Sequence, residues 1–124
     1  MRVVSPTPDR TTTTPNATMT ALAGPSQGGA ELSTWLVRMN EGARGPLHAI
    51  DREQVWMTTS GRLSFEVDGV THHAVAGEAA VLPAGVMRLV STVDGPAEAI
   101  VCMVAGGAAS TPENPGPIPL PWAQ

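Results

Sequence analysis

Glycine and proline cut this chain into short apolar runs, and that punctuation limits the folds it can adopt. The 124 residues include 13 glycines and 12 prolines, too many for a bundle of long helices. Between residues 17 and 105, eight or nine apolar runs end at turn signals such as SG, DG, PAG and DGP. Short strands at this spacing are typical of β-sandwiches and barrels, so we predict an all-β fold.

The clearest strand pair lies in the middle of the chain. Residues 62–67 (RLSFEV) alternate, with Leu63, Phe65 and Val67 on one face. The dipeptide Asp68-Gly69 follows, and residues 70–76 form the next apolar run. Such a dipeptide between two alternating runs predicts a two-residue β-hairpin.

Both ends of the chain differ in composition from the middle. Residues 1–16 hold three prolines and four consecutive threonines, and residues 110–121 hold five prolines. Proline removes a backbone donor and excludes regular helix or central strand. We therefore expect a flexible N-terminal arm over 1–16, one folded domain over 17–106 and a Pro-rich C-terminal tail over 107–124.

Charge and cysteine content exclude several classes of protein. The net charge is −4 and all seven cations are arginine, so no basic stripe is available for nucleic acid or an acidic membrane. No apolar run approaches the length of a membrane span, and the N-terminus does not resemble a signal peptide. A single cysteine, Cys102, excludes an intrachain disulfide and a multi-cysteine metal cluster. We expect a soluble, cytoplasmic protein.

The spacing of glycine, proline and polar residues over 31–105 resembles that of the cupins, which are small double-sheet jelly-roll barrels. Two cupin motifs fall within residues 42–92. The first is represented by Gly42, His48, Ile50, Gln54 and Gly61, and the second by Gly77, Pro83, Gly85, Arg88 and Thr92. The resemblance implies a single cupin-like jelly-roll β-barrel and predicts that these motif positions face its interior.

The chain departs from the cupin pattern where cupins hold a metal. In that pattern two histidines and a glutamate of the first motif, and a histidine of the second, bind a divalent ion. Here these positions are His48, Ile50, Gln54 and Arg88. Ile50 cannot coordinate and Arg88 only donates hydrogen bonds, whereas such sites need about three N, S or carboxylate ligands. We therefore predict no metal and no other cofactor.

His48 and Arg88 are the candidate catalytic residues. A buried, unpaired guanidinium is costly, so Arg88 either reaches the rim or packs there, or it binds an anion such as a ligand carboxylate, enolate or phosphate. An apolar wall and a nearby arginine favour neutral His48, which suits a general base. Gln54 would then orient the substrate.

Further residues are expected to line the barrel. Trp35, Met39, Ile50 and Trp56 would form an apolar wall for a hydrophobic substrate. Of the adjacent His72 and His73, only one can face inward. Cupin spacing favours His72 as a substrate-binding residue, whereas the apolar neighbour Val75 favours His73. If the inward histidine approached His48, a weak two-histidine metal site would become conceivable.

Three functions follow from these expectations. The first is a metal-independent acid–base enzyme of isomerase, cyclase or lyase type, acting on an apolar small molecule with an acidic or enolisable group. The second is a ligand-binding or sensor cupin without chemistry. The third is a metal-dependent oxygenase or isomerase with a degenerate site. We also expect a homodimer, in which the strand over 17–24 could extend a partner's sheet.

Overall fold

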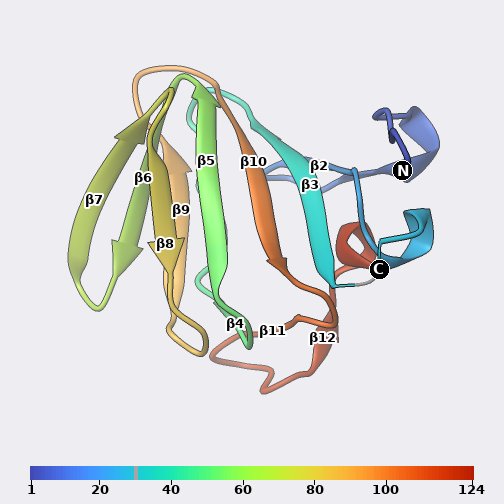
Figure 1. The fold of residues 1–124 in the computed structure, drawn as a ribbon. Coiled ribbons are helices and arrows are strands. Elements are labelled where there is room, and N and C mark those ends of the chain that lie inside the picture. Colours follow the sequence, from blue (N-terminus) through green and yellow to red (C-terminus); the bar gives the residue numbers. More distant parts are fainter. Residues whose placement is uncertain (30) are drawn as a thin grey trace.

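The fold is built on a six-stranded antiparallel sheet, seen in Figure 1 from its outer side. The computed structural model describes residues 1–29 and 31–124. The order of strands in this sheet is β1-β2-β3-β10-β5-β8. Their bounds are β1 Thr11–Thr13, β2 Thr18–Ala21, β3 Leu32–Met39, β5 Gln54–Ser60, β8 Ala79–Leu82 and β10 Ala97–Val104.

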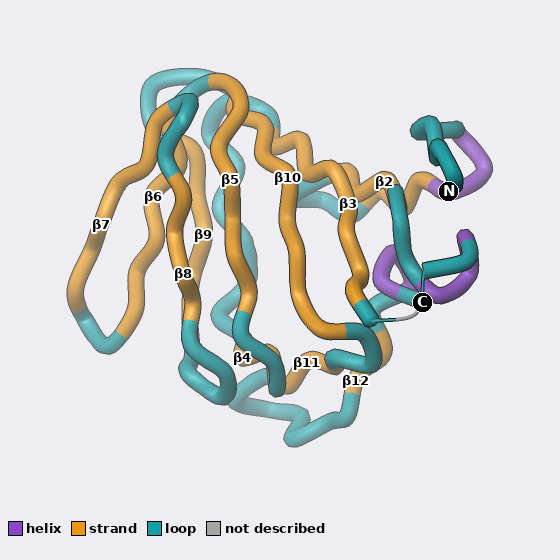
Figure 2. Tube along the Cα trace, viewed as in Figure 1, coloured by secondary structure: helices purple, strands orange, loops and turns teal. Residues whose placement is uncertain are grey.

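Two three-stranded sheets complete the barrel. One has the order β7-β6-β9 and the other β12-β11-β4. Their bounds are β4 Ala49–Ile50, β6 Arg62–Val67, β7 Val70–Val75, β9 Arg88–Thr92, β11 Ala108–Ser110 and β12 Ile118–Pro119. Three short 3₁₀ helices, η1 Pro8–Arg10, η2 Pro25–Gln27 and η3 Pro121–Ala123, are the only helices in the described residues. Figure 2 shows strands and loops making up nearly all of the chain. The prediction of an all-β jelly roll is confirmed.

The long strands β3 and β10 show why the core lies where it does. Inward positions of β3 are Ser33, Trp35, Val37 and Met39, and every second residue of β10 is also buried. Large residues of β3 stand beside small ones of β10, as in the Met39–Ala97 pair. Alternation with period two therefore gives this sheet one apolar face.

The predicted hairpin forms between β6 and β7. Val67 pairs with Val70, and the two residues between them have positive φ angles, 50° at Asp68 and 75° at Gly69. This backbone matches the right-handed twist of the strands, which explains why the Asp-Gly dipeptide specifies the turn.

Both ends of the chain pack against the region expected to hold the folded domain, residues 17–106. β1 pairs with β2, and Thr11 Oγ1 lies 2.9 Å from Thr20 Oγ1. Near the C-terminus, Leu120 and Ala123 are buried. Proline restricts the ladders there to short ones, such as the pairing of β12 with β11, but it leaves extended segments whose apolar side chains still pack.

This arrangement also overturns the expected route to a dimer. β2 has β1 on one edge and β3 on the other. Both sets of its backbone groups face strands of the same chain, so the 17–24 strand does not offer a free edge to a partner sheet.

Within the described residues no helix has the length and apolar character needed to cross a bilayer.

Docking of the C-terminal segment should be measurable as stability. Replacing Leu120, which is 6 % exposed, with alanine should lower the free energy of unfolding by about 2 kcal/mol, the low end for a buried leucine because Leu120 borders a cavity. Leu47, 45 % exposed, is the control, and Leu47→Ala should cost less than about 0.5 kcal/mol. Urea unfolding would measure both. Equal losses would contradict the docked arrangement.

Candidate functional site

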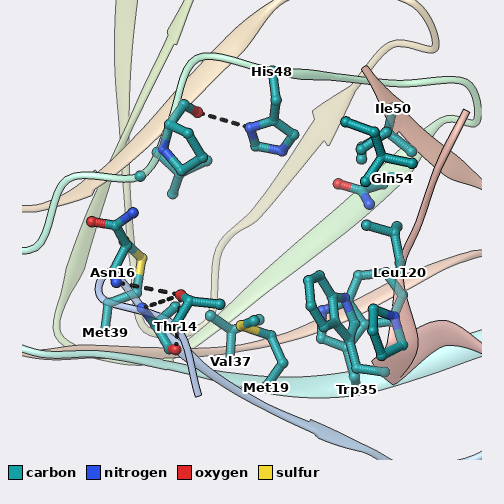
Figure 3. Close-up of a pocket in the computed structure, with 18 of the residues that line it drawn as sticks. Thr14, Asn16, Met19, Trp35, Val37, Met39, His48, Ile50, Gln54 and Leu120 are labelled. Atoms are coloured by element: carbon teal, nitrogen blue, oxygen red, sulfur yellow. Dashed lines mark hydrogen bonds between the residues drawn. The ribbon is translucent and has the colours of Figure 1, made fainter. Parts of the chain in front are cut away.

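A cavity of about 330 Å³ opens inside the barrel. Its wall is mostly apolar and combines strand residues with both ends of the chain (Figure 3). The strand and loop residues are Met19, Trp35, Val37, Met39, Gly45, Pro46, His48, Ile50, Gln54, Trp56, Val90 and Ala109, and the terminal segments add Thr14, Asn16, Ala17, Thr111 and residues 118–122. Among the described residues that line it there is no Asp, Glu, Arg or Lys. A cavity of this kind suits an uncharged, largely apolar molecule.

His48 is the titratable side chain on this wall. Its backbone is fixed by a two-way bridge to Arg88, with His48 N donating to Arg88 O at 3.1 Å and Arg88 N donating to His48 O at 2.8 Å. The ring atom Nδ1 lies 2.8 Å from the Pro46 carbonyl oxygen. Because a carbonyl only accepts, Nδ1 carries the proton. The neutral ring then has its lone pair on Nε2, on the ring edge turned toward the cavity in Figure 3.

The surroundings of His48 favour this neutral form. Burial lowers the pKa of His48 below its usual 6.5, and the nearby positive charge of Arg88 lowers it further. The hydrogen bond to Pro46 acts in the opposite direction but is outweighed by burial. At neutral pH, His48 is therefore a proton acceptor.

Gln54 is the second polar group facing the cavity. It is 3 % exposed, and its Oε1 accepts two hydrogen bonds of 3.1 Å, one from Trp56 Nε1 and one from Arg88 Nη1. Its Nε2 lies 3.7 Å from the sulfur of Met103, a weak acceptor. The alternation of β5 places Gln54 and Trp56 on the same inward face.

Arg88 lies behind this wall and does not line the cavity. It is 1 % exposed, and besides Gln54 its guanidinium donates to Pro83 O at 3.0 Å and Val86 O at 3.1 Å. Burial lowers the pKa of Arg88 to about 10, so it stays charged at neutral pH. Protein oxygens thus accept one hydrogen bond from each of the three nitrogens of Arg88, and direct binding of a ligand anion by Arg88 stays a prediction.

Of the remaining predicted site residues, four line the cavity and one does not. Trp35, Met39, Ile50 and Trp56 all line the cavity. His72 does not: it is exposed on β7, as is its neighbour His73, whose Nδ1 lies 2.6 Å from Arg62 Nη2. His72 stands opposite the buried Phe65 on β6. The position lies on an edge strand outside the cavity wall, so His72 is not placed to bind a ligand there.

Sequence reasoning missed the contribution of the chain ends. Asn16 and Thr14 from the N-terminal segment, and Leu120 and Trp122 from the C-terminal one, line the cavity. An apolar residue at every second position of Ile118-Pro119-Leu120-Pro121-Trp122 was the available signal. The high proline content of this segment led us to expect a tail outside the folded domain, so this alternation was not used.

Comparison with known proteins gives the family. Residues 35–105, more than half of the chain, match the family model of the cupin domain. The chain belongs to the cupin family. No curated protein matches it.

Solved structures similar to this cupin share its fold at low identity. A mutant of oxalate decarboxylase from Bacillus subtilis has a TM-score of 0.72 and 18 % identity, over 82 % of this chain and 29 % of that chain. An RmlC-like cupin from Shewanella frigidimarina has a TM-score of 0.65 and 21 % identity, over 79 % and 86 %. A cupin-superfamily sugar phosphate isomerase from Silicibacter pomeroyi has a TM-score of 0.59 and 24 % identity, over 77 % and 73 %. Likeness at these identities shows the fold alone.

The four positions that bind metal in the cupin pattern do not fit a metal here. Ile50 is buried and apolar, and Arg88 places a positive charge beside the site. The Gln54 oxygen, the remaining candidate beside His48, already accepts from Trp56 and Arg88. No three His, Cys, Asp or Glu side chains of the described chain gather where they could hold an ion. We derive no chemistry through a metal at this position.

Neutral His48 predicts how stability depends on pH in this cupin. Because its pKa is lower in the folded state than in the unfolded chain, the unfolded chain binds more protons, and stability falls as pH drops below about 6.5. In His48→Gln this contribution disappears, so the melting temperature should fall less between pH 7.5 and pH 5.5 than in wild type. Thermal unfolding at both pH values tests this. An identical decrease in the two proteins would mean that His48 does not carry a lowered pKa.

Proposed function

We propose that this cupin is a metal-independent acid–base enzyme in which His48 Nε2 removes a proton from a neutral, largely apolar small molecule. The observation that carries the proposal is the hydrogen bond from Nδ1 to Pro46 O, which leaves the basic nitrogen for the cavity. A general base needs a pKa near or below the working pH and access to the substrate. His48 has both features in an apolar cavity.

The substrate class in this proposal is narrower than the sequence suggested. An anionic substrate would lose its hydration without meeting a cation, because no arginine or lysine among the described residues lines the cavity. A neutral compound with an acidic C–H or O–H group carries no such cost. We therefore keep the enolisable substrate and set aside the anionic one.

Isomerase, cyclase and lyase reactions share this proton removal as a step. The same histidine can return the proton to another carbon, or the new electron pair can close a ring or expel a leaving group. The similar structures include one named as a sugar phosphate isomerase and one named as an oxalate decarboxylase. That support is analogy between folds and does not name a substrate.

A second candidate is ligand binding without chemistry. It is favoured by the same cavity, where no second titratable side chain among the described residues accompanies His48. A sensor or carrier needs the apolar wall and a few orienting polar groups and has no need for proton transfer.

Exchange of acidic hydrogens in D₂O separates these two functions. Wild type, incubated with a panel of neutral ketones, esters and lactones, should exchange the α-hydrogens of at least one compound, followed by NMR. His48→Gln should slow this exchange by about 100-fold or more while still binding the compound. His73→Gln, which changes an exposed histidine outside the cavity, should behave as wild type. Exchange at wild-type rates in His48→Gln, or none in wild type, would refute the enzymatic role.

We also propose a cytoplasmic homodimer, formed through the outer face of the six-stranded sheet. Leu32, Met57, Val81 and Val104 point outward there, with exposures of 49, 38, 59 and 57 %. Clustered apolar residues on a sheet face are typical of an interface between chains. Sedimentation of Val81→Glu should show a marked loss of dimer. Val70→Glu, on strand β7 of the β7-β6-β9 sheet, should leave the dimer intact. Monomeric wild type, or no effect of Val81→Glu, would count against this interface.

A further inference from the structure

The side-chain amide of Gln54 has a fixed orientation. Its two partners at Oε1, Trp56 Nε1 and Arg88 Nη1, can only donate hydrogen bonds. Rotating the amide by half a turn would place its NH₂ against both donors, each of which would lose its acceptor in a buried site. The oxygen must therefore face Arg88 and Trp56, and the NH₂ group must be Nε2.

The NH₂ group is left without a strong acceptor. Gln54 is 3 % exposed, and the acceptor that its Nε2 finds within the described chain is the sulfur of Met103 at 3.7 Å. A thioether accepts weakly, and Nε2 carries two hydrogens. A buried donor in this state is costly unless a ligand supplies an oxygen.

We infer that Gln54 Nε2 is the binding site for the carbonyl oxygen of a neutral ketone, ester or related compound. Both Gln54 and His48 line the cavity, and Figure 3 shows them on the same side of it. A donor for the oxygen and an acceptor for a proton on the adjacent carbon are the two groups that enolisation requires. The enolisation step rests on the proposed function of His48, whereas carbonyl binding by Gln54 does not.

Arg88 is a positioning residue in this arrangement. It does not touch the ligand but donates to Gln54 Oε1 at 3.1 Å, which fixes the amide and polarises it. Hydrogen bonds in a chain strengthen one another, so the polarised NH₂ donates more strongly to an oxygen that gains negative charge. This explains why a fully charged guanidinium is retained at a position that is 1 % exposed and has no carboxylate beside it among the described residues.

Proton removal and return by His48 require no reactant besides the ligand. His48 Nε2 takes a hydrogen from the carbon next to the carbonyl. The electrons of that C–H bond form a C=C bond, and the carbonyl π electrons move to the oxygen held by Gln54. The protonated imidazole then returns a proton to carbon, so the cycle consumes nothing.

Acetophenone and α-methylstyrene test the carbonyl site, because they have nearly the same shape and differ by C=O against C=CH₂. The measured quantity is the affinity for acetophenone divided by that for α-methylstyrene, by ligand-observed NMR titration of each protein. Gln54→Glu keeps an oxygen acceptor for Arg88 and Trp56 but removes the NH₂. It should lower this ratio about fivefold or more, the value of one hydrogen bond.

Asn40→Leu is the matched control, because it removes an exposed amide outside the cavity wall and should leave the ratio within about twofold of wild type. An unchanged ratio in Gln54→Glu would overturn the assignment. Binding of neither compound by wild type would also overturn it. These outcomes do not depend on proton exchange, so they are distinct from a failure of the proposed function.

Arg88→Met tests the positioning role. It should lower the same ratio, and the NMR signals of the Gln54 side-chain amide should move toward those of a freely rotating amide, neither of which follows from a purely structural role. Arg88→Lys, which restores a donor, should recover part of the ratio. Arg62→Met, at an exposed arginine, controls for loss of charge. An unchanged ratio in folded Arg88→Met would overturn the role of Arg88. If Arg88→Met does not fold, Arg88→Lys decides: a ratio above that of Gln54→Glu supports the role, and a ratio equal to that of Gln54→Glu overturns it.

Discussion

The hydrogen bond from Arg88 to Gln54 is the interaction on which the interior of this protein depends. It joins β9 to β5, and its donor is a buried cation with no carboxylate partner among the described residues. Burying such a charge costs several kcal/mol unless hydrogen bonds compensate for the lost hydration. Gln54, Pro83 and Val86 each accept one hydrogen bond from a different guanidinium nitrogen, and the bond to Gln54 anchors the second motif to the first.

The same arginine shapes the chemistry of the cavity from outside it. Its backbone bridges that of His48, and its charge helps to keep the imidazole neutral. Its guanidinium orients Gln54, whose NH₂ is then left for a ligand. Position 88 holds a metal ligand in the cupin pattern. Here its arginine favours His48 as a proton acceptor and orients Gln54 as a hydrogen-bond donor. Arg88 lies behind the cavity wall and not in it. The described residues that line the cavity therefore include no charged side chain.

Local patterns in the sequence were sufficient for much of this arrangement. The turn at Asp68-Gly69 requires positive φ at two residues, and the motif spacing with period-two alternation brought His48, Gln54 and Trp56 to one interior. The partners of Arg88 could not be predicted, because two of them are backbone carbonyls whose direction depends on a loop. The packing of Leu120 and Trp122 was hidden, since proline content reports on ladder formation and not on side-chain burial. His72 lies on an edge strand, where the exposure of a side chain depends on tertiary contacts and not on the local pattern.

The chemistry of the cavity depends on a neutral His48 with its proton on Nδ1 and its lone pair on Nε2. NMR of the protein labelled with nitrogen-15 in histidine measures this directly, because the two ring nitrogens have different chemical shifts in each tautomer. At neutral pH we expect a protonated Nδ1 and an unprotonated Nε2, with protonation of the ring only at a pH below the usual range of a histidine. A proton on Nε2, or a charged imidazolium at neutral pH, would contradict the account.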